Sequence, residues 1–329
     1  MIDIFNTPAL LNPQMDYLYF LQNIRQSVPN AVSDFFMGVT VIGESLFSIT
    51  FMALIYWCIN KKYGELIVLS CTFGYLINQL MKLVFCIYRP WILDSRIMPY
   101  DKAIPGAYGY SFPSGHTARV TLNFGGAALC FKSKAVKIFC LLIILSVAFS
   151  RNFLGVHTLQ DVVVGFLISI VVVLLLKYFL EKFDLKNNKL IDGIFTAFLI
   201  VTSLIVLYYI RVKAYPMDYI DGQLLVDSLQ MQTGVFKASG ILIGCSIGGF
   251  IERHYINFEI SQNVYKRSLD GIIGFISIYF LIKFAKWLII PIGANKGYFI
   301  SYIIIGLFVT AIYPLFIKKT NKIFSHIIK

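Results

Sequence analysis

Residues Val162–Leu180 read VVVGFLISIVVVLLLKYFL, an apolar stretch that contains a single charged residue, Lys177. A helix needs about 20 mainly apolar residues to cross the hydrocarbon core of a bilayer, so this stretch predicts a membrane-spanning helix. Eight further stretches are candidates, and they are Phe36–Trp57, Leu66–Phe85, Thr117–Phe131, Ile138–Phe149, Ile191–Ile210, Val235–Ile251, Ile272–Ile290 and Tyr298–Ile317. The stretches Thr117–Phe131 and Ile138–Phe149 are short, and we expect them to extend into the flanking polar residues, which would be buried in protein rather than lipid. We therefore predict an all-α fold, a polytopic transmembrane helical bundle of about nine spans.

The composition of the chain agrees with a membrane environment. Hydrophobic residues make up 58% of the 329 residues and charged residues 14%, whereas soluble domains have about 45–50% and about 25%. A disordered chain needs low hydrophobicity and high charge, so this class is excluded. The apolar residues of a soluble protein of this length would overfill its cores, which leaves the bilayer as the solvent.

The basic excess indicates how the chain is oriented in the membrane. Lys and Arg number 29 against 17 Asp and Glu, and basic residues gather in the cytoplasmic loops of membrane proteins. With nine spans, the loops that carry Lys132, Lys182 and Lys318 all fall on one side. We predict that this side is cytoplasmic, with the N-terminus outside and the C-terminus in the cytoplasm of a cell-membrane protein. Because no basic stripe with interleaved aromatic residues occurs, we expect no nucleic-acid partner.

Three segments place polar residues where apolar ones are expected. They are Lys82–Pro90 at the end of the second predicted span, Pro113–His116 before the third, and Ser150–Asp161 between the fourth and the fifth. In the predicted topology all three lie on the non-cytoplasmic face, although they were not used to assign it. Charged residues inside a membrane cost free energy on insertion, so they tend to be functional or paired.

The cationic residues of these segments are suited to a phosphate group. Lys82, Arg89 and Arg151 supply positive charge, and a guanidinium can match phosphate oxygens with two parallel hydrogen bonds. Ser114 and Gly115 precede the start of a predicted helix, where hydroxyl and backbone N–H groups can meet an anion. The pattern therefore favours a phosphate-binding site. The alternative is structural: cations at the membrane interface whose charged ends reach water.

Two histidines and one aspartate can supply the reactive groups. His157 and Asp161 are spaced i, i+4 and so share one face of a helix. The carboxylate can then hold one imidazole nitrogen while the other attacks phosphorus, and His116 from another helix can protonate the leaving oxygen. Two alternatives stay open: the His–Asp pair is a structural hydrogen bond, or the three residues ligate a metal. The neighbouring cations would repel a divalent ion, so we predict no metal site.

Together the segments resemble the signature of the type 2 phosphatidic acid phosphatase family, integral membrane lipid phosphatases that are related to vanadium haloperoxidases. The family pattern is Lys-x6-Arg-Pro, Pro-Ser-Gly-His and Ser-Arg-x5-His-x3-Asp, and every defining residue is present in order. The resemblance covers about Phe36–Leu180 and implies a six-helix phosphatase-like core. It also implies a hydrolase that cleaves a membrane lipid phosphate or pyrophosphate at the extracytoplasmic face, without a metal or other cofactor.

The resemblance further implies a role for each matching residue. His157 is the expected nucleophile that forms a phosphohistidine, Asp161 orients it, and His116 is the general acid that later activates water. The expected phosphate-binding residues are Lys82, Arg89, Ser114, Gly115 and Arg151, with Pro90, Pro113 and Ser150 in supporting positions.

The remaining segments are placed around this core. Residues 1–35 are predicted to form an N-terminal interfacial segment, because Met15–Gln26 is amphipathic. The phosphatase core is predicted over residues 36–185, and residues 186–329 form a four-span extension of unknown role. In this extension the Glu252–His254 cluster is expected to be solvated, and the loop Arg211–Lys237 is a candidate cap over the active-site face.

Two other functions are compatible with the sequence. A phosphotransferase on the same fold would pass the phosphoryl group to an alcohol or lipid acceptor, whereas a lipid transporter or flippase would use the embedded charges without chemistry. Free phosphate as the product distinguishes hydrolysis from transfer, and lipid movement that survives the loss of His157 would identify a transporter. The identity of the lipid phosphate is not readable, because apolar tail pockets are built from generic residues.

Overall fold

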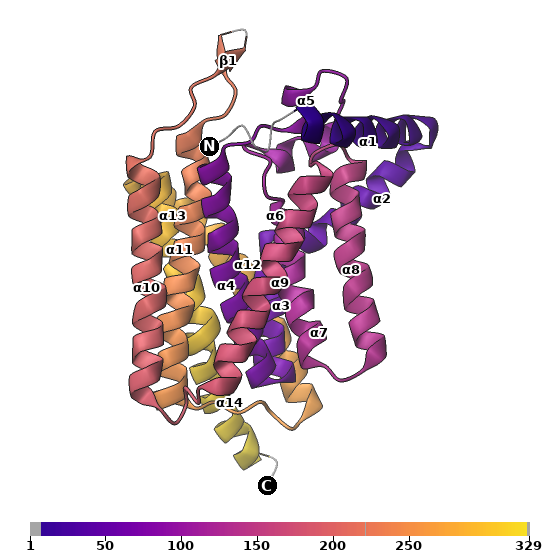
Figure 1. Cartoon of the computed structure of the whole chain (residues 1–329). Coiled ribbons are helices and arrows are strands. Elements are labelled where there is room, and N and C mark those ends of the chain that lie inside the picture. Colours follow the sequence, from indigo (N-terminus) through magenta and orange to yellow (C-terminus); the bar gives the residue numbers. More distant parts are fainter. Residues whose placement is uncertain (1–7, 221, 328–329) are drawn as a thin grey trace. The chain divides into compact units, whose positions relative to one another are not determined.

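The structure, a computed structural model, describes residues 8–220 and 222–327, and these are almost entirely helical (Figure 1). The α-helices are α1 (Pro8–Ser27), α2 (Asn30–Thr40), α3 (Ser45–Leu54), α4 (Lys61–Phe85), α5 (Pro90–Leu93), α6 (Gly115–Val120), α7 (Gly126–Cys130), α8 (Lys134–Phe153), α9 (Leu159–Lys182), α10 (Lys189–Val212), α11 (Ser228–Ile251), α12 (Val264–Ile292), α13 (Ala294–Leu307) and α14 (Tyr313–Ile327). Short 3₁₀ or π-helical pieces are η1 (Val41–Gly43), η2 (Ile55–Ile59), η3 (Asp101–Ala103), η4 (Pro105–Ala107), η5 (Thr121–Gly125), η6 (Glu252–Ile256) and η7 (Phe308–Ile312).

One small hairpin accompanies the helices. Its strands β1 (Tyr219–Ile220) and β2 (Gln223–Leu224) pair antiparallel, with Tyr219 opposite Leu224. The predicted all-α fold is otherwise confirmed. The first seven residues of the predicted N-terminal segment lie outside the described residues.

The structure contains seven or eight candidate membrane spans, close to the about nine that the sequence predicts. Within the described ranges, seven helices are long and apolar enough to cross a membrane, and Asn30–Gly43 with Ser45–Ile59 would form an eighth, bent by 52°. The predicted span Thr117–Phe131 corresponds to α6, η5 and α7, which follow one another without a break and have 6, 5 and 5 residues, so this stretch is shorter than the about 20 residues that a crossing usually takes. The chain is a multi-pass integral membrane protein.

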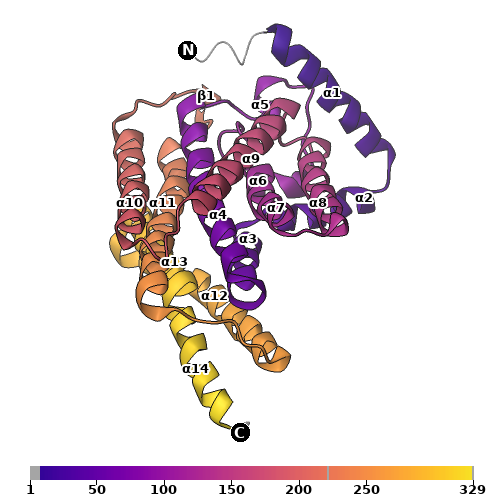
Figure 2. The same ribbon diagram turned by 60° about the horizontal axis from the view of Figure 1, so that its bottom comes forward.

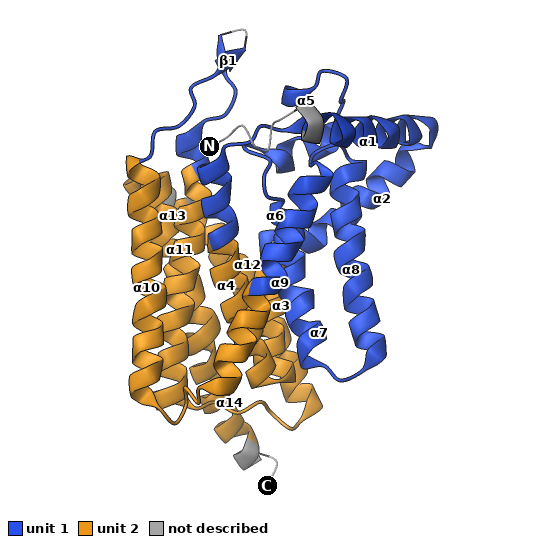
Figure 3. Cartoon of the chain, in the orientation of Figure 1, with its two compact units in different colours: residues 1–47, 77–171, 213–231 blue, residues 48–76, 172–212, 232–329 orange. Residues whose placement is uncertain are grey.

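The helices form two compact units, drawn in different colours in Figure 3. Unit 1 comprises Met1–Phe47, Ile77–Val171 and Lys213–Met231, and unit 2 comprises Ser48–Leu76, Val172–Val212 and Gln232–Lys329. The chain passes from one unit to the other within α3, α4, α9 and α11 and at the end of α10. The three polar segments singled out in the sequence all belong to unit 1.

Unit 1 buries the inner face of its N-terminal helix. Met15 and Leu18 of α1 are 1% exposed and pack with Ile97. Near the end of α1, Arg25 donates a hydrogen bond to the carbonyl of Phe153 at 2.7 Å. Helices α2 and α8 lie side by side in both views (Figures 1 and 2). These contacts hold the end of α8 that leads into the third polar segment.

In unit 2, glycines allow the closest helix contacts. A Cβ on Gly244 of α11 would lie 2.2 Å from the carbonyl oxygen of Ile303 in α13, and one on Gly240 would lie 2.4 Å from that of Phe299. Small residues let membrane helices approach until their backbones touch. Alongside this pair, α12 packs against α13.

A buried ion network in unit 2 corrects the expectation that the Glu252–His254 cluster is solvated. Glu252 is 0% exposed and Arg253 8%. The Arg253 guanidinium pairs with Asp192 (Nη2 to Oδ1 2.6 Å), and Lys61 pairs with Glu252 at 2.6 Å. The partners are distant in the sequence, so no local pattern indicated that these charges are paired and buried rather than hydrated.

Candidate active site

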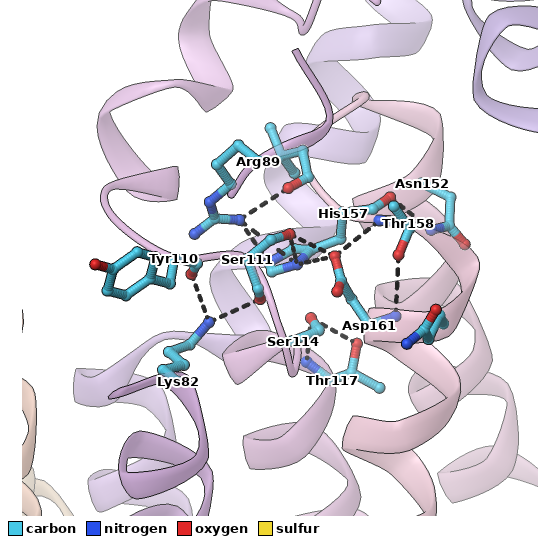
Figure 4. Close-up of polar contacts among 12 residues, drawn as sticks. Lys82, Arg89, Tyr110, Ser111, Ser114, Thr117, Asn152, His157, Thr158 and Asp161 are labelled. Atoms are coloured by element: carbon cyan, nitrogen blue, oxygen red, sulfur yellow. Dashed lines mark hydrogen bonds and ion pairs between the residues drawn. The ribbon is translucent and has the colours of Figure 1, made fainter. Parts of the chain in front are cut away.

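The residues of the three polar segments converge in unit 1, where Figure 4 shows their polar contacts. Lys82 lies in the last turn of α4, and Arg89 directly precedes α5. Ser114 is the N-cap of α6, and Arg151 lies in the last turn of α8. His157 lies in the α8–α9 connection, and Asp161 lies in the first turn of α9. All six side chains are buried. Five different helices, or the residues directly before them, and the α8–α9 connection therefore deliver charged or hydroxyl groups to one place.

His157 and Asp161 form the hydrogen-bonded pair that their spacing predicts. His157 Nδ1 lies 3.1 Å from Asp161 Oδ2, and the side chains are 2% and 3% exposed. The same carboxylate accepts a hydrogen bond from the backbone N–H of Thr158 at 2.9 Å and one from the hydroxyl of Ser111. A carboxylate held in this way keeps the imidazole proton on Nδ1 and leaves the lone pair on Nε2.

The Arg89 guanidinium faces the other side of the same imidazole. Its Nη1 lies 2.9 Å from His157 Nε2 and donates to the carbonyl of Val156 at 2.8 Å. Its Nε donates to the carbonyl of Gly109 at 3.0 Å. Because a guanidinium only donates, Nε2 must accept, which agrees with the tautomer that Asp161 selects. The site thus places a cation beside the nitrogen whose lone pair is available for attack.

Two further cations line the site. Lys82 Nζ donates to the carbonyls of Tyr110 at 3.0 Å and Ser111 at 2.9 Å. Arg151 is 2% exposed, and its Nε and Nη2 have no hydrogen-bond partner among the residues that the structure describes. A buried guanidinium with unpaired donors is costly unless an anion completes it. Arg151 therefore has donors available for phosphate oxygens.

The remaining predicted residues shape the walls of the site. Ser114 caps α6, since its Oγ accepts from the backbone N–H of Thr117 at 3.4 Å and from the Thr117 hydroxyl at 3.0 Å. The hydroxyl of Ser150 donates to the carbonyl of Val147 at 2.7 Å. Gly115 begins α6, Pro113 precedes the cap, and Pro90 begins α5. The described contacts of Ser150 are those of a structural residue.

His116 enters the site from α6 at a close contact with η1. No hydrogen bond joins it to His157 within the described part of the chain. A Cβ on Gly43 would lie 2.9 Å from the Cβ of His116 and 3.1 Å from its Cα. On the same helix, Arg119 donates to the carbonyl of Gly43 at 3.1 Å. The close approach of η1 therefore sets the position of His116, and it requires a glycine.

Burial and the surrounding cations act on both histidines. Burial lowers the pKa of His157 well below its usual range, and the charges of Arg89, Lys82 and Arg151 lower this pKa further. The pKa of His116 is also lowered, by burial first and then mainly by Arg151. Both imidazoles are therefore neutral at neutral pH in the ligand-free site. A bound anion would offset the cations and raise both pKa values again.

If His116 is the general acid that the resemblance implies, replacing Gly43 with alanine is expected to lower kcat by about 10²-fold, because a catalytic group displaced by about 1 Å loses that much. The new Cβ would collide with the Cα and Cβ of His116, so the backbone of α6 must move. The measurement is steady-state phosphate release by the purified variant. Gly38→Ala is the matched control, since a Cβ there meets nothing within 4 Å. Equal kcat values for the two variants would contradict the close-contact argument.

Sequence reasoning missed Ser111 and the carbonyls that hold the cations. Ser111 Oγ donates to Asp161 and lies 3.2 Å from His157 Nδ1. The carbonyls of Gly109 and Tyr110 orient Arg89 and Lys82. These residues directly precede the Pro113–His116 segment, but a backbone carbonyl or a serine hydroxyl leaves no pattern in the sequence.

The segment Lys213–Met231, within the loop considered as a candidate cap, belongs to unit 1. Lys213 Nζ donates to the carbonyl of Val84 at 3.0 Å, at the end of α4. Gly109 has a φ of 74°, and a Cβ there would lie 1.9 Å from Sδ of Met231. The segment therefore packs against the two stretches of chain that hold Lys82 and Arg89.

Comparison with known families assigns two parts of the chain. Residues 64–184 match the PAP2 superfamily, and residues 236–322 match the PAP2 superfamily phosphatase, transmembrane extension. The first match contains all three polar segments, and the second lies in the C-terminal helices. No solved structure matches the chain significantly.

Two curated proteins are distant relatives. The chain is 27% identical over 172 residues to the lipid phosphate phosphatase delta of Arabidopsis thaliana, and the alignment covers 48% of this chain and 41% of the relative. It is 25% identical over 246 residues to the probable sphingosine-1-phosphate phosphatase of Dictyostelium discoideum, and this alignment covers 69% of this chain and 54% of the relative. The matches thus span about half the length of these relatives.

Proposed function

Because the chain belongs to the PAP2 superfamily of membrane phosphatases, we propose that it hydrolyses a lipid phosphate or pyrophosphate through a phosphohistidine. The observation that carries this proposal is the environment of His157, whose Nδ1 faces Asp161 while Nε2 faces Arg89. This is the arrangement that a nitrogen nucleophile beside a phosphate site requires. The two relatives, named as phosphatases of lipid phosphates, support the same substrate class.

In the first step the substrate phosphate binds among Lys82, Arg89 and Arg151. Arg89 exchanges its contact with His157 Nε2 for the phosphoryl oxygens, and the unpaired donors of Arg151 complete the anion site. Nε2 then attacks phosphorus and the bond from phosphorus to the lipid oxygen breaks. His116, protonated under the influence of the bound anion, gives its proton to that oxygen, so that a lipid alcohol leaves.

In the second step water removes the phosphoryl group. Neutral His116 takes a proton from a water molecule, whose oxygen attacks phosphorus while the bond to His157 Nε2 breaks. Inorganic phosphate leaves and His116 is protonated again. The cations stabilise the charge that develops on the phosphoryl oxygens in both steps. Asp161 stabilises the imidazolium-like charge on His157 and itself stays ionised.

We place this site at the extracytoplasmic face of the cell membrane, with the C-terminus in the cytoplasm. The distribution of basic loop residues supports this orientation. The substrate would enter laterally, with its tails in the bilayer and its headgroup among the cations. No metal takes part in the proposed reaction, because a cationic site suits an anion and would repel a divalent ion.

The proposal is tested by measuring phosphate release from a panel of lipid phosphates by the purified full chain, with and without chelator. The panel contains phosphatidate, a sphingoid phosphate and a polyprenyl pyrophosphate. Free phosphate, unchanged by chelator, is the expected product. A phosphorylated acceptor without free phosphate would indicate the phosphotransferase instead, and loss of activity with chelator would contradict the metal-free mechanism.

The pH dependence should separate the free site from the occupied one. In the free protein the pKa of His116 is lowered by burial and by Arg151, so His116 loses its proton already at a low pH as the pH rises. A bound phosphate raises this pKa. The alkaline limb of kcat/KM, which reports the free enzyme, should therefore lie at lower pH than the alkaline limb of kcat. Coincident limbs, or limbs that persist in His116→Ala, would contradict the assignment.

A further inference from the structure

Asn78 is a buried amide outside the three polar segments. It lies on α4 and is 2% exposed. Within the described residues neither its Nδ2 nor its Oδ1 has a hydrogen-bond partner. An amide buried without partners costs free energy that an apolar side chain of the same shape would not. Its presence at this position therefore calls for a ligand as the missing partner.

The position of Asn78 directs its amide toward the phosphate site. It precedes Lys82 by four residues, so the two side chains lie on one face of α4. A Cβ on Gly115 would lie 3.5 Å from Asn78 Oδ1 and 3.8 Å from Lys82 Cε. The same small space is therefore bordered by the Asn78 amide, the aliphatic part of Lys82 and the start of α6. In the proposed orientation Asn78 lies one helical turn deeper in the membrane than Lys82.

The chemistry of this space favours a phosphoryl oxygen. Phosphoryl oxygens only accept, and they need donors on several sides. Lys82 already donates to the carbonyls of Tyr110 and Ser111, whereas both protons on Nδ2 of Asn78 are unused. A neutral donor also adds no further repulsion to the three cations of the site.

We propose that Asn78 contacts the substrate directly, by donating a hydrogen bond from Nδ2 to an oxygen of the phosphoryl group. This inference rests on the proposed function, because it takes the phosphate-binding site from there. It adds a recognition element on α4 outside the three polar segments. It also gives a partner to an amide that has none among the residues that the structure describes.

The test measures the binding of inorganic phosphate to the purified full chain, without turnover, together with the melting temperature of the phosphate-free protein. Asn78→Leu keeps the shape but removes the donor, and should raise the dissociation constant for phosphate by about tenfold or more. Its phosphate-free melting temperature should equal or exceed that of the wild type, because a buried unpaired amide is gone. Asn78→Ala should weaken binding similarly, and Asn78→Asp more, since its carboxylate repels the anion. Gln79→Ala, which removes the neighbouring amide on another face of α4, is the control and should bind phosphate as the wild type does.

An unchanged dissociation constant in Asn78→Leu and Asn78→Ala would overturn the proposal. A lower phosphate-free melting temperature in Asn78→Leu would also overturn it, because it would reveal a structural partner. Failure of the proposed function looks different: the wild type would bind phosphate, lose affinity on substitution of Asn78, and yet release no phosphate from any lipid. A wild type that binds no phosphate would contradict both.

Discussion

His157→Ala should release no phosphate above background from any lipid phosphate, a loss of about 10⁴-fold or more in kcat. The reason is chemical: Nδ1 of His157 lies 3.1 Å from the carboxylate of Asp161, which leaves Nε2 of the same ring as the proposed attacking nitrogen. Without this nitrogen the proposed phosphohistidine cannot form. The measurement is phosphate release under saturating lipid, with the wild type and the variant purified in the same detergent.

Two companions make this result specific. Asp161→Asn keeps the hydrogen-bonding shape but loses the charge that fixes the His157 tautomer, so it should retain a small residual rate. Leu159→Ala, at a neighbouring 45% exposed position, should behave as the wild type. All three variants should melt as cooperatively as the wild type. Retained turnover in folded His157→Ala would refute the mechanism, and lipid movement in that variant would indicate a transporter.

The second large effect is expected from His116→Ala, which should lower kcat for lipid phosphates by about 10²–10⁴-fold. A lipid alkoxide is a poor leaving group and needs a proton, which we propose that this histidine supplies. An aryl phosphate whose phenolate leaves without a proton should largely escape the defect in the first step. The second step still needs His116 to activate water. The variant should therefore release about one equivalent of phenolate per protein and then stall.

This stalled state can be observed directly. With the aryl phosphate labelled on phosphorus, His116→Ala should accumulate label on the protein as an acid-labile phosphoramidate. The double variant His116→Ala/His157→Ala should accumulate none. If His116→Ala releases no initial equivalent of phenolate from the aryl phosphate, or if label appears in the double variant, the assigned roles of the two histidines are wrong.

Much of the fold was predictable, and the errors have identifiable physical causes. Hydropathy located the long helices, because a membrane helix satisfies its backbone internally and must be apolar along its length. It also marked Thr117–Phe131, where α6, η5 and α7 follow one another without a break but have only 6, 5 and 5 residues. It also treated Glu252–His254 as solvated, whereas Asp192 and Lys61 from other helices pair with this cluster.

The site was predictable to a different degree for each of its parts. The i, i+4 spacing of His157 and Asp161 forecast a contact that the structure confirms at 3.1 Å, because one helical turn brings these positions together. The spacing of Lys82, Arg89 and Arg151 indicated phosphate chemistry, and the family match supports it. Ser111, by contrast, lies 50 positions from Asp161 in the chain, so only the folded chain reveals its contact.

The amino-acid sequence alone therefore established a multi-pass membrane protein, its three polar segments and the local histidine–aspartate pair. Apolar length and helical periodicity are properties of neighbouring residues, so they can be read along the chain. The tertiary structure decided which donors are already used and which are not. Arg89 is held by the carbonyls of Gly109 and Val156, whereas Arg151 and Asn78 keep unpaired donors in the described site. Such pairings depend on contacts between segments that are distant in the sequence. Whether a buried polar group is paired is therefore decided only when the chain folds, and an unpaired one is costly in the low dielectric of the interior.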